Sequence, residues 1–368
     1  MINSLSDKIY DKAANNTIPL AVHFDLTYRC NLDCIHCYIS EEYRKPTLSD
    51  KKELVNENRK ELETKEIFNI LDQLKDAGTL FLTFSGGEIF LRSDILEILR
   101  YARDKRFSFS LLTNGTLLSN DGIVEQLNEL DLQAVDVSLY SSQPDIHDSI
   151  TQSFGSYKRT VTAIERLRER DVTVTIKCPI MKTNVDSYQG IVNFADSHGA
   201  NFVFDPNITP MKNGDMWPTD LRISDQELKS YFSFIERFFN EKKVDNYADP
   251  SAPFCEDSLK KRPCGASHSS CYISPYGDIQ ACIEIPISCG NLREESFEKI
   301  WESSEEMIRI RQLERGDFEN CSDCPNSGYC PRCMGQSYVE NGSLLSPSPE
   351  ICRETKIRSQ LEEVKKHE

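Results

Sequence analysis

The sequence predicts an α/β protein in two parts, a partial (β/α)6 barrel of the TIM type followed by a small cysteine-rich domain. Between residues 19 and 205, six strand-like runs alternate with five helix-like runs. This alternation is typical of βαβ units around a parallel sheet, and six units make an open version of the eightfold barrel. The second domain is predicted because ten of the fourteen cysteines fall between Cys255 and Cys352.

The predicted elements follow one another in short runs. The strand candidates are apolar stretches at 19–26, 79–84, 107–113, 134–139, 172–178 and 201–205. The helix candidates are 66–76, 94–105, 121–130, 157–168 and 187–198. In the first of these, Ile67, Ile70, Leu71 and Leu74 have the spacing of one buried helical face. In a barrel of this kind, functional residues are expected at the C-terminal ends of the strands.

The change of pattern along the chain predicts five segments. They are an N-terminal segment (1–18), the barrel (19–210), a connector with a helix (211–260), the cysteine-rich domain (261–352) and a charged C-terminal helix (353–368). In the connector, Ser224 and Glu227 form a capping box, and an apolar helical stripe follows them.

Composition and charge restrict the class of protein. The chain has 368 residues, of which 39% are hydrophobic and 28% charged, as in soluble globular proteins. Residues 1–16 lack the apolar core of a signal peptide, and no apolar run could span a bilayer, so we expect a cytoplasmic protein without a membrane partner. In a reducing cytosol the cysteines are expected to be metal ligands. The net charge of −16 argues against a nucleic-acid partner.

Three thiols lie on the loop that follows the first predicted strand. Cys30, Cys34 and Cys37 have the spacing Cys-x3-Cys-x2-Cys. Three thiolates on one short loop can hold three irons of a 4Fe–4S cube, and the loop has no fourth cysteine, so the fourth iron is predicted to be open. The alternatives are a zinc site, which generally takes four ligands, and buried core thiols, which rarely lie so close together.

This loop resembles the cluster-binding signature of the radical S-adenosylmethionine (SAM) enzymes, with His36 where that family usually has an aromatic residue. The resemblance implies the partial barrel fold and a SAM molecule that chelates the open iron through its amino and carboxylate groups. It also implies that an electron from the cluster cleaves SAM to methionine and a 5′-deoxyadenosyl radical, which abstracts a substrate hydrogen. An external electron donor of the flavodoxin or ferredoxin type is the expected partner.

Further SAM contacts are predicted at the ends of later strands. Gly86, Gly87 and Glu88 follow the second strand, and glycines let the backbone approach a ligand closely, although an ordinary tight turn has the same composition. Their position resembles the family's Gly-Gly-Glu motif, which holds the SAM amino group. The remaining candidates are Thr113, Asn114, Ser138, Arg159 and Lys177. For the last three, a surface or strand-end role is the alternative.

The later cysteines have a pattern of their own. They are spaced Cys264-x12-Gly277-x4-Cys282, then Cys321-x2-Cys324-x5-Cys330-x2-Cys333, and then Cys352. Cysteines this dense, with glycine and proline between them, are typical of domains that fold around metal. Two zinc knuckles are the generic alternative, but these knuckles are closer together than in the usual zinc ribbon and would leave six of the ten cysteines of this region without a role.

The pattern resembles the SPASM domain, a C-terminal extension of radical SAM enzymes with two auxiliary 4Fe–4S clusters. The chain would then carry three 4Fe–4S clusters. The resemblance assigns the distal auxiliary cluster to Cys321, Cys324, Cys330 and Cys352, and the nearer one to Cys264, Cys282 and Cys333. Cys333 comes one residue earlier than the family spacing requires. Cys255 is a candidate fourth ligand of the nearer cluster, in competition with Cys271, Cys289 or an open iron. Cys178, on a strand, is predicted to be a small buried residue.

The leading functional prediction comes from the same resemblance. SPASM enzymes mostly modify peptides or proteins, so we expect a maturase that installs a thioether or carbon–carbon crosslink, or a related oxidation, in a ribosomally made peptide. An auxiliary cluster would oxidise the product radical. Because about 18 residues precede the first strand, no leader-binding domain is expected there. The barrel and SPASM surfaces, or a separate leader-binding protein, would hold the peptide.

Three other functions are kept as alternatives. The first is a small-molecule enzyme, such as a haem-precursor decarboxylase or an alcohol dehydrogenase. The second is an anaerobic sulfatase maturase. Those enzymes resemble one another in placing a catalytic Asp directly after the cysteine that corresponds to Cys282, where this chain has Ile283, and Glu284 is a catalytic candidate one residue later. The third is a metal-binding scaffold without activity, against which the open three-cysteine site argues.

Overall fold

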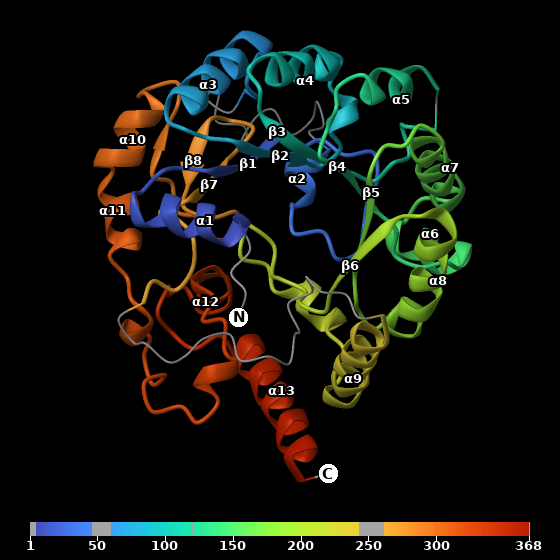
Figure 1. Cartoon of the computed structure of the whole chain (residues 1–368), viewed down its shortest axis with the longest axis vertical. Helices are drawn as coiled ribbons and strands as arrows, with labels where there is room; N and C mark the ends of the chain where they lie inside the picture. Colours follow the sequence, from blue (N-terminus) through green and yellow to red (C-terminus); the bar gives the residue numbers. More distant parts are fainter. Residues whose placement is uncertain (1–4, 46–59, 120, 243–260, 368) are drawn as a thin grey trace.

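A nine-stranded sheet is the centre of the computed structural model, which describes residues 5–45, 60–119, 121–242 and 261–367 (Figure 1). The strand order is β6-β5-β4-β3-β2-β1-β7-β8-β9. The strands are β1 (Ala21–Thr27), β2 (Phe81–Gly86), β3 (Ser108–Thr113), β4 (Ala134–Ser138), β5 (Val174–Pro179), β6 (Asn201–Asp205), β7 (Ser270–Ile273), β8 (Asp278–Gln280) and β9 (Gly290–Asn291). The first six pair in parallel. The predicted α/β fold is confirmed.

Helices cover the outer side of this curved sheet, as Figure 1 shows for α3, α4, α5, α7 and α8. The helices are α1 (Leu5–Asn15), α2 (Glu41–Arg44), α3 (Thr64–Asp76), α4 (Ile95–Asp104), α5 (Asp121–Asn128), α6 (Pro144–Thr151), α7 (Ser156–Glu169), α8 (Tyr188–His198), α9 (Asp225–Lys242), α10 (Phe297–Ser303), α11 (Glu305–Arg311), α12 (Met334–Asn341) and α13 (Pro349–His367). Short 3₁₀ turns are η2 (Ile89–Leu91), η3 (Val185–Ser187), η4 (Trp217–Leu221), η5 (Arg315–Asp317) and η6 (Ser327–Tyr329).

The core lies between the sheet and its helices. Burial alternates along β3 and β4, as expected of side chains that point to opposite faces of a strand. The rings of Phe24, Phe84 and Phe109, from three neighbouring strands, contact one another, with ring centres 6.3 and 5.7 Å apart. The buried face of α3 consists of Ile67, Ile70, Leu71 and Leu74, as predicted. Within the described ranges, no helix combines the length and apolar character needed to cross a membrane.

Six of the described helices were not predicted, namely α1, α2, α6, α10, α11 and α12. The segment that contains α1 was expected to be a polar N-terminal extension. Its buried residues are two small ones, Ala13 and Ala14, so it has little apolar periodicity to read. Tyr10 nevertheless stacks on Phe81, with ring centres 5.9 Å apart. α6 starts with Pro144 at its first turn, a signal that the sequence reading did not use.

The cysteine-rich region is joined to the barrel through the sheet itself. β7 pairs in parallel with β1, with Ala21 opposite Ser270 and Phe24 opposite Ile273, and β8 and β9 continue antiparallel. α9 of the connector packs against α13 near the C-terminus (Figure 1). Residues 243–260 of the predicted connector, among them Cys255, lie outside the described residues. The first edge strand of the barrel is thus shared by both parts of the chain.

Candidate active site

A cavity of about 450 Å³ lies at the C-terminal ends of the parallel strands, where barrels of this type carry their functional residues. The loop after β1 forms one wall of it. The ends of β2, β3, β4 and β6 contribute Gly86, Thr113, Ser138 and Asp205. The predicted site residues that line this cavity are Cys30, Cys34, Cys37, Gly86, Gly87, Thr113, Asn114, Ser138, Lys177 and Glu284.

Protein contacts fix the shape of the cysteine loop. Cys30 N donates to the carbonyl oxygen of Arg44 (3.2 Å). The buried guanidinium of Arg44 in turn donates to the carbonyls of Ile39 (2.9 Å) and Leu32 (3.2 Å), and it pairs with Asp33 at 3.0 Å. Buried backbone carbonyls need such donors. The helical turn α2 therefore fixes the conformation of the cysteine loop through Arg44.

The three thiols of this loop lie close enough to interact electrostatically. Burial raises the pKa of Cys30 to about 11, and the neighbouring Cys37 adds to this rise. Burial also raises the pKa of Cys34, and Cys37 and Cys30 raise it further. Crowded thiolates need a positive partner, and the irons of a cluster would supply it. The donor set therefore fits a cluster held by three thiolates.

A single metal ion would need a different geometry. Among the described residues, no three Cys, His, Asp or Glu side chains are placed to share one ion. A 4Fe–4S cube does not need such a group, because each of its thiolates binds a separate iron. The thiols of a cube accordingly stand farther apart than the ligands of a zinc ion.

Gly86 and Gly87 pack against the chain that leads into the cysteine loop. A Cβ on Gly86 would lie 1.9 Å from the carbonyl oxygen of Thr27, and one on Gly87 would lie 2.3 Å from that of Arg29. Gly86 also has a φ of +135°, which L side chains rarely adopt. The structure shows close approach to the backbone of Thr27 and Arg29, and both glycines also line the cavity. Their predicted close approach to a ligand stays a prediction.

Glu88 is fully buried beside this turn. Its carboxylate accepts hydrogen bonds from Thr113 Oγ1 (2.9 Å), Asn114 N (2.9 Å) and Phe90 N (3.1 Å). Burial raises the pKa of Glu88 to about 7, and these donors lower it in part. The carboxylate therefore positions the Thr113–Asn114 end of β3. Its predicted contact with the SAM ammonium stays a prediction.

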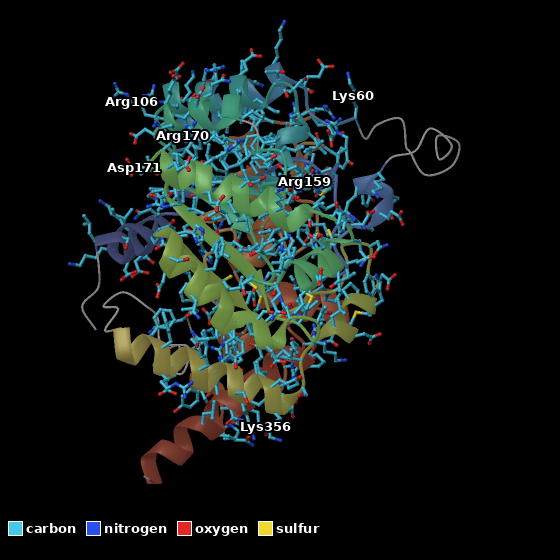
Figure 2. The ribbon with its side chains drawn as sticks, turned by 90° about the vertical axis from the view of Figure 1, so that its right-hand side faces the viewer. Lys60, Arg106, Arg159, Arg170, Asp171 and Lys356 are labelled. Atoms are coloured by element: carbon cyan, nitrogen blue, oxygen red, sulfur yellow. The ribbon has the colours of Figure 1, made fainter. Side chains whose placement is uncertain are left out.

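The other predicted SAM contacts divide into two sets. Asn114 Nδ2 donates to Asn31 Oδ1 (2.9 Å) and approaches Cys30 Sγ at 3.9 Å, so it links β3 to the cysteine loop. Arg159 lies on α7, on the face turned to the viewer in Figure 2. Its guanidinium donates to Ser153 Oγ (3.2 Å) and to the carbonyl of Phe154 (3.4 Å), in the loop between α6 and α7. Arg159 thus contacts the loop between α6 and α7, and it does not line the cavity with the other predicted SAM-binding residues.

The electrostatic neighbours of the later cysteines follow the two groups that the SPASM resemblance implies. The charge on Cys352 interacts with Cys330, Cys321 and Cys324, and that on Cys333 interacts with Cys282 and Cys264. Among the remaining described cysteines, the buried Cys271 has Cys289 as a thiol neighbour, and Cys178 is buried on β5, as predicted. Metal ligation by these residues, and by Cys255 outside the described ranges, stays a prediction.

A local turn explains the short spacing before Cys333. Arg332 has a φ of +50°, in the left-handed region, and its guanidinium is buried. It donates to the carbonyl oxygens of Arg315 (3.1 Å) and Cys321 (3.4 Å). This turn separates Cys330 from Cys333, and their sulfurs belong to different groups although two residues lie between them.

Glu284 lies between the cavity and the nearer auxiliary thiols. Its Oε2 accepts from the Cys333 thiol at 3.6 Å, and burial raises its pKa. Gly335 makes room for it, because a Cβ there would lie 2.5 Å from the Glu284 Cβ. The sequence reading missed two further acidic residues of the cavity, Asp136 and Asp205. Asp205 ends its strand, so the barrel rule could have found it, whereas Asp136 lies in the middle of β4.

Comparison with known proteins agrees with this geometry. The profile of the radical SAM superfamily matches residues 24–195, and that of the SPASM iron–sulfur cluster-binding domain matches residues 264–325. The AdoMet-dependent heme synthase of Methanosarcina barkeri is 27% identical over 91% of this chain and 97% of that protein. The subtilosin biosynthesis protein AlbA of Bacillus subtilis is 27% identical over 90% of this chain and 71% of its own length.

A solved structure shares the fold at low identity. Streptococcus suis SuiB, bound to its precursor peptide SuiA, superposes with a TM-score of 0.70 at 16% identity, over 94% of this chain and 80% of that one. At this identity the likeness concerns the fold alone. With the two matched domains and the cysteine loop at the end of β1, it follows that the chain belongs to the radical SAM superfamily and carries a SPASM domain.

Proposed function

We propose that this protein is a maturase that uses SAM and three 4Fe–4S clusters to oxidise a ribosomally made peptide, forming a thioether or carbon–carbon crosslink or a related modification. Two similarities support a peptide substrate. AlbA is named for the biosynthesis of the bacteriocin subtilosin, and SuiB was solved with a precursor peptide. An external donor of the flavodoxin or ferredoxin type would supply the electron, and a separate protein could present the peptide leader.

The charge of the cavity is the observation that carries the proposal. Among the described residues, its charged lining consists of three acids, Asp136, Asp205 and Glu284, and one base, Lys177. Lys177 is already paired with Asp136 at 3.4 Å. Like charges in a cavity of low dielectric repel strongly. Such a lining suits a cationic cofactor and a neutral or basic peptide segment, and it opposes a substrate that must place a carboxylate at the reacting centre.

The chain's own residues have distinct parts in the proposed reaction. Cys30, Cys34 and Cys37 would hold the cluster which, with SAM, supplies the 5′-deoxyadenosyl radical. Asn114 and Ser138 offer polar groups at the strand ends for the nucleoside. Glu284 is placed to accept the proton that the substrate releases on oxidation, because it reaches both the cavity and the auxiliary thiols.

A haem-precursor decarboxylase is the second candidate, and one observation favours it. The match to the M. barkeri heme synthase extends over 97% of that protein, whereas AlbA has additional length that this chain does not match. A decarboxylase must bind the carboxylate that it removes. The acidic lining of the cavity weighs against this reading and makes it the weaker of the two.

One experiment separates these candidates. The reconstituted enzyme, SAM and a reductant are incubated with each short peptide encoded beside its gene, or with a tetrapyrrole that carries propionate groups. Mass spectrometry then follows the products. Loss of two hydrogens from a peptide supports the proposal. Loss of carbon dioxide from the tetrapyrrole, with every peptide unchanged, would overturn it in favour of the decarboxylase.

A further inference from the structure

Lys212 lies in a cage of tyrosines that the reaction described above does not use. Its Nζ donates to the hydroxyls of Tyr28 (3.0 Å) and Tyr272 (2.9 Å). The same ammonium lies 4.4 Å from the ring centre of Tyr272, 4.9 Å from that of Tyr28 and 5.4 Å from that of Tyr38. These are cation–π distances. Because 16% of the side chain is exposed, the charge lies in surroundings where electrostatic interactions are strong.

The cage touches both cluster-binding regions. The backbone N of Lys212 donates to the carbonyl of Tyr38 (2.8 Å), the residue that follows Cys37. Lys212 also lines a second, smaller cavity together with Glu284, two residues beyond Cys282. Its charge accordingly interacts with Cys282 and, less strongly, with Cys37. One largely buried cation thus contacts the residue that follows Cys37 and lines the same small cavity as the two residues that follow Cys282.

Asp25 is the compensating anion of this cage. It is fully buried, accepts from the Tyr272 hydroxyl (2.7 Å), contacts His23 Nε2 (3.1 Å), and lies 3.9 Å from Lys212 Nζ. Its charged neighbours are His23 and Lys212, whereas those of Lys212 include the two thiols. Lys212 and Asp25 therefore form a buried ion pair, in which Lys212 lies over the Tyr38 ring and lines the smaller cavity, whereas Asp25 does not line it.

We propose that Lys212 is the shared counter-cation of the two cluster sites and that it raises the reduction potential of the site formed by Cys264, Cys282 and Cys333. Reduction adds one negative charge to a cluster, and net charge is one of the terms that set cluster potentials. A nearby buried cation stabilises the added charge. The auxiliary site is within reach of this charge because Lys212 lines the smaller cavity with Ile283 and Glu284, the two residues that follow Cys282.

This charge would favour electron transfer from the substrate radical to the auxiliary site. This part of the inference rests on the proposed peptide oxidation. The substrate radical loses one electron and one proton to become the product. The proton would go to a carboxylate of the cavity lining, and the electron would go to the auxiliary site, which the charge of Lys212 would make easier to reduce. Without Lys212, the same electron transfer would be less favourable.

The test is a potentiometric titration of the reconstituted holoenzyme, followed by EPR. Added SAM identifies the signal of the first site, and Cys324→Ala identifies that of the distal site. Lys212→Gln keeps a donor for the tyrosine hydroxyls and should shift the potential of the nearer auxiliary site to more negative values. Asp25→Asn leaves the cation uncompensated and should shift the same potential in the positive direction. The distal site should stay unchanged in both variants.

The opposite signs distinguish charge from packing damage. Equal shifts in one direction, or no shift in either variant, would overturn the proposal. If Lys212→Gln fails to take up iron, the positive shift of Asp25→Asn still decides the question. Lys182→Gln is the matched control, because this exposed lysine donates to the Asp220 carbonyl away from the cage, and its potentials should equal those of the wild type. Failure of the peptide proposal would appear separately, as unmodified peptide with both shifts present.

Discussion

The first cysteine loop and the distal cysteine group are held by different means. The loop of Cys30 follows a strand in the middle of the sheet and is fixed by the buried Arg44. The distal group lies among turns, where Arg315 donates to the Cys330 carbonyl at 2.8 Å, and Cys352 is exposed. The protein alone can preform the first site, whereas metal binding must supply much of the order of the second.

The largest expected effect follows from changing the first site. Replacement of Cys30, Cys34 and Cys37 together by Ala should abolish SAM cleavage and remove about one third of the iron, because the auxiliary groups have separate thiols. The barrel should stay folded, since Arg44 and the sheet hold the loop. Iron content, 5′-deoxyadenosine and circular dichroism are measured on the same preparation. Retained 5′-deoxyadenosine production would rule out the assignment of this site.

The distal group should respond in the opposite way. Cys324→Ala removes one proposed ligand and should lower iron content and the midpoint of thermal unfolding of the C-terminal region. SAM cleavage without substrate should survive because the barrel has its own core, whereas peptide modification should fall much further. 5′-Deoxyadenosine and modified peptide are measured side by side. Equal loss of both, with the first site still loaded, would show that the two regions do not act separately.

The sequence was sufficient for the position of the cysteine-rich region and for the strands. The spacing alone would pair Cys330 with Cys333, and only the resemblance to the SPASM domain assigned Cys330 to the group of Cys321, Cys324 and Cys352. The six barrel strands could be found because buried parallel strands are short apolar runs between amphipathic helices. Strand ends then located Thr113 and Ser138 in the cavity.

The direction of side chains and the contacts between distant segments could not be predicted from the sequence. Arg159 has the right chemistry to bind a carboxylate, but helical spacing does not show that its guanidinium turns toward Ser153. The pairing of β7 with β1 joins residues about 250 positions apart, and no local pattern encodes it. Lys212 lies in a proline-rich connector, and its tyrosine partners come from two other segments of the chain. The cage therefore forms only when these segments come together in the folded protein.

Glu88→Gln tests how finely the first site is preformed. The carboxylate holds Thr113 and Asn114 and is also predicted to bind the SAM ammonium. Losing a charge-assisted hydrogen bond typically costs about 1.5–3 kcal/mol, which corresponds to roughly 10- to 100-fold weaker SAM binding. Iron content should be unchanged. Equilibrium dialysis with labelled SAM measures the affinity, and Glu97→Gln, at an exposed position on α4, is the control. Wild-type affinity in Glu88→Gln would make this residue purely structural.

The smallest expected effect is a pH dependence of stability that arises at the same residue. Burial raises the pKa of Glu88 from 4.5 to about 7 in the folded chain. Between these values the folded protein keeps a proton that the unfolded chain has lost, so the contribution of Glu88 is fully present below pH 4.5 and is lost as the pH rises through 7. Glu88→Gln cannot titrate. The wild type should therefore lose stability relative to this variant between roughly pH 5 and 8.

Thermal unfolding of both proteins is measured at pH 5 and pH 8. The stability difference between wild type and Glu88→Gln is then compared at the two pH values, so that the contributions of all other titrating groups cancel. Glu354→Gln serves as the comparison from the C-terminal region, because burial also raises the pKa of Glu354 to about 7. A difference between wild type and Glu88→Gln that does not change with pH would mean that Glu88 is already ionised at the lower pH. The donors Thr113, Asn114 and Phe90 would then outweigh burial, and the first site would be preformed around a charge.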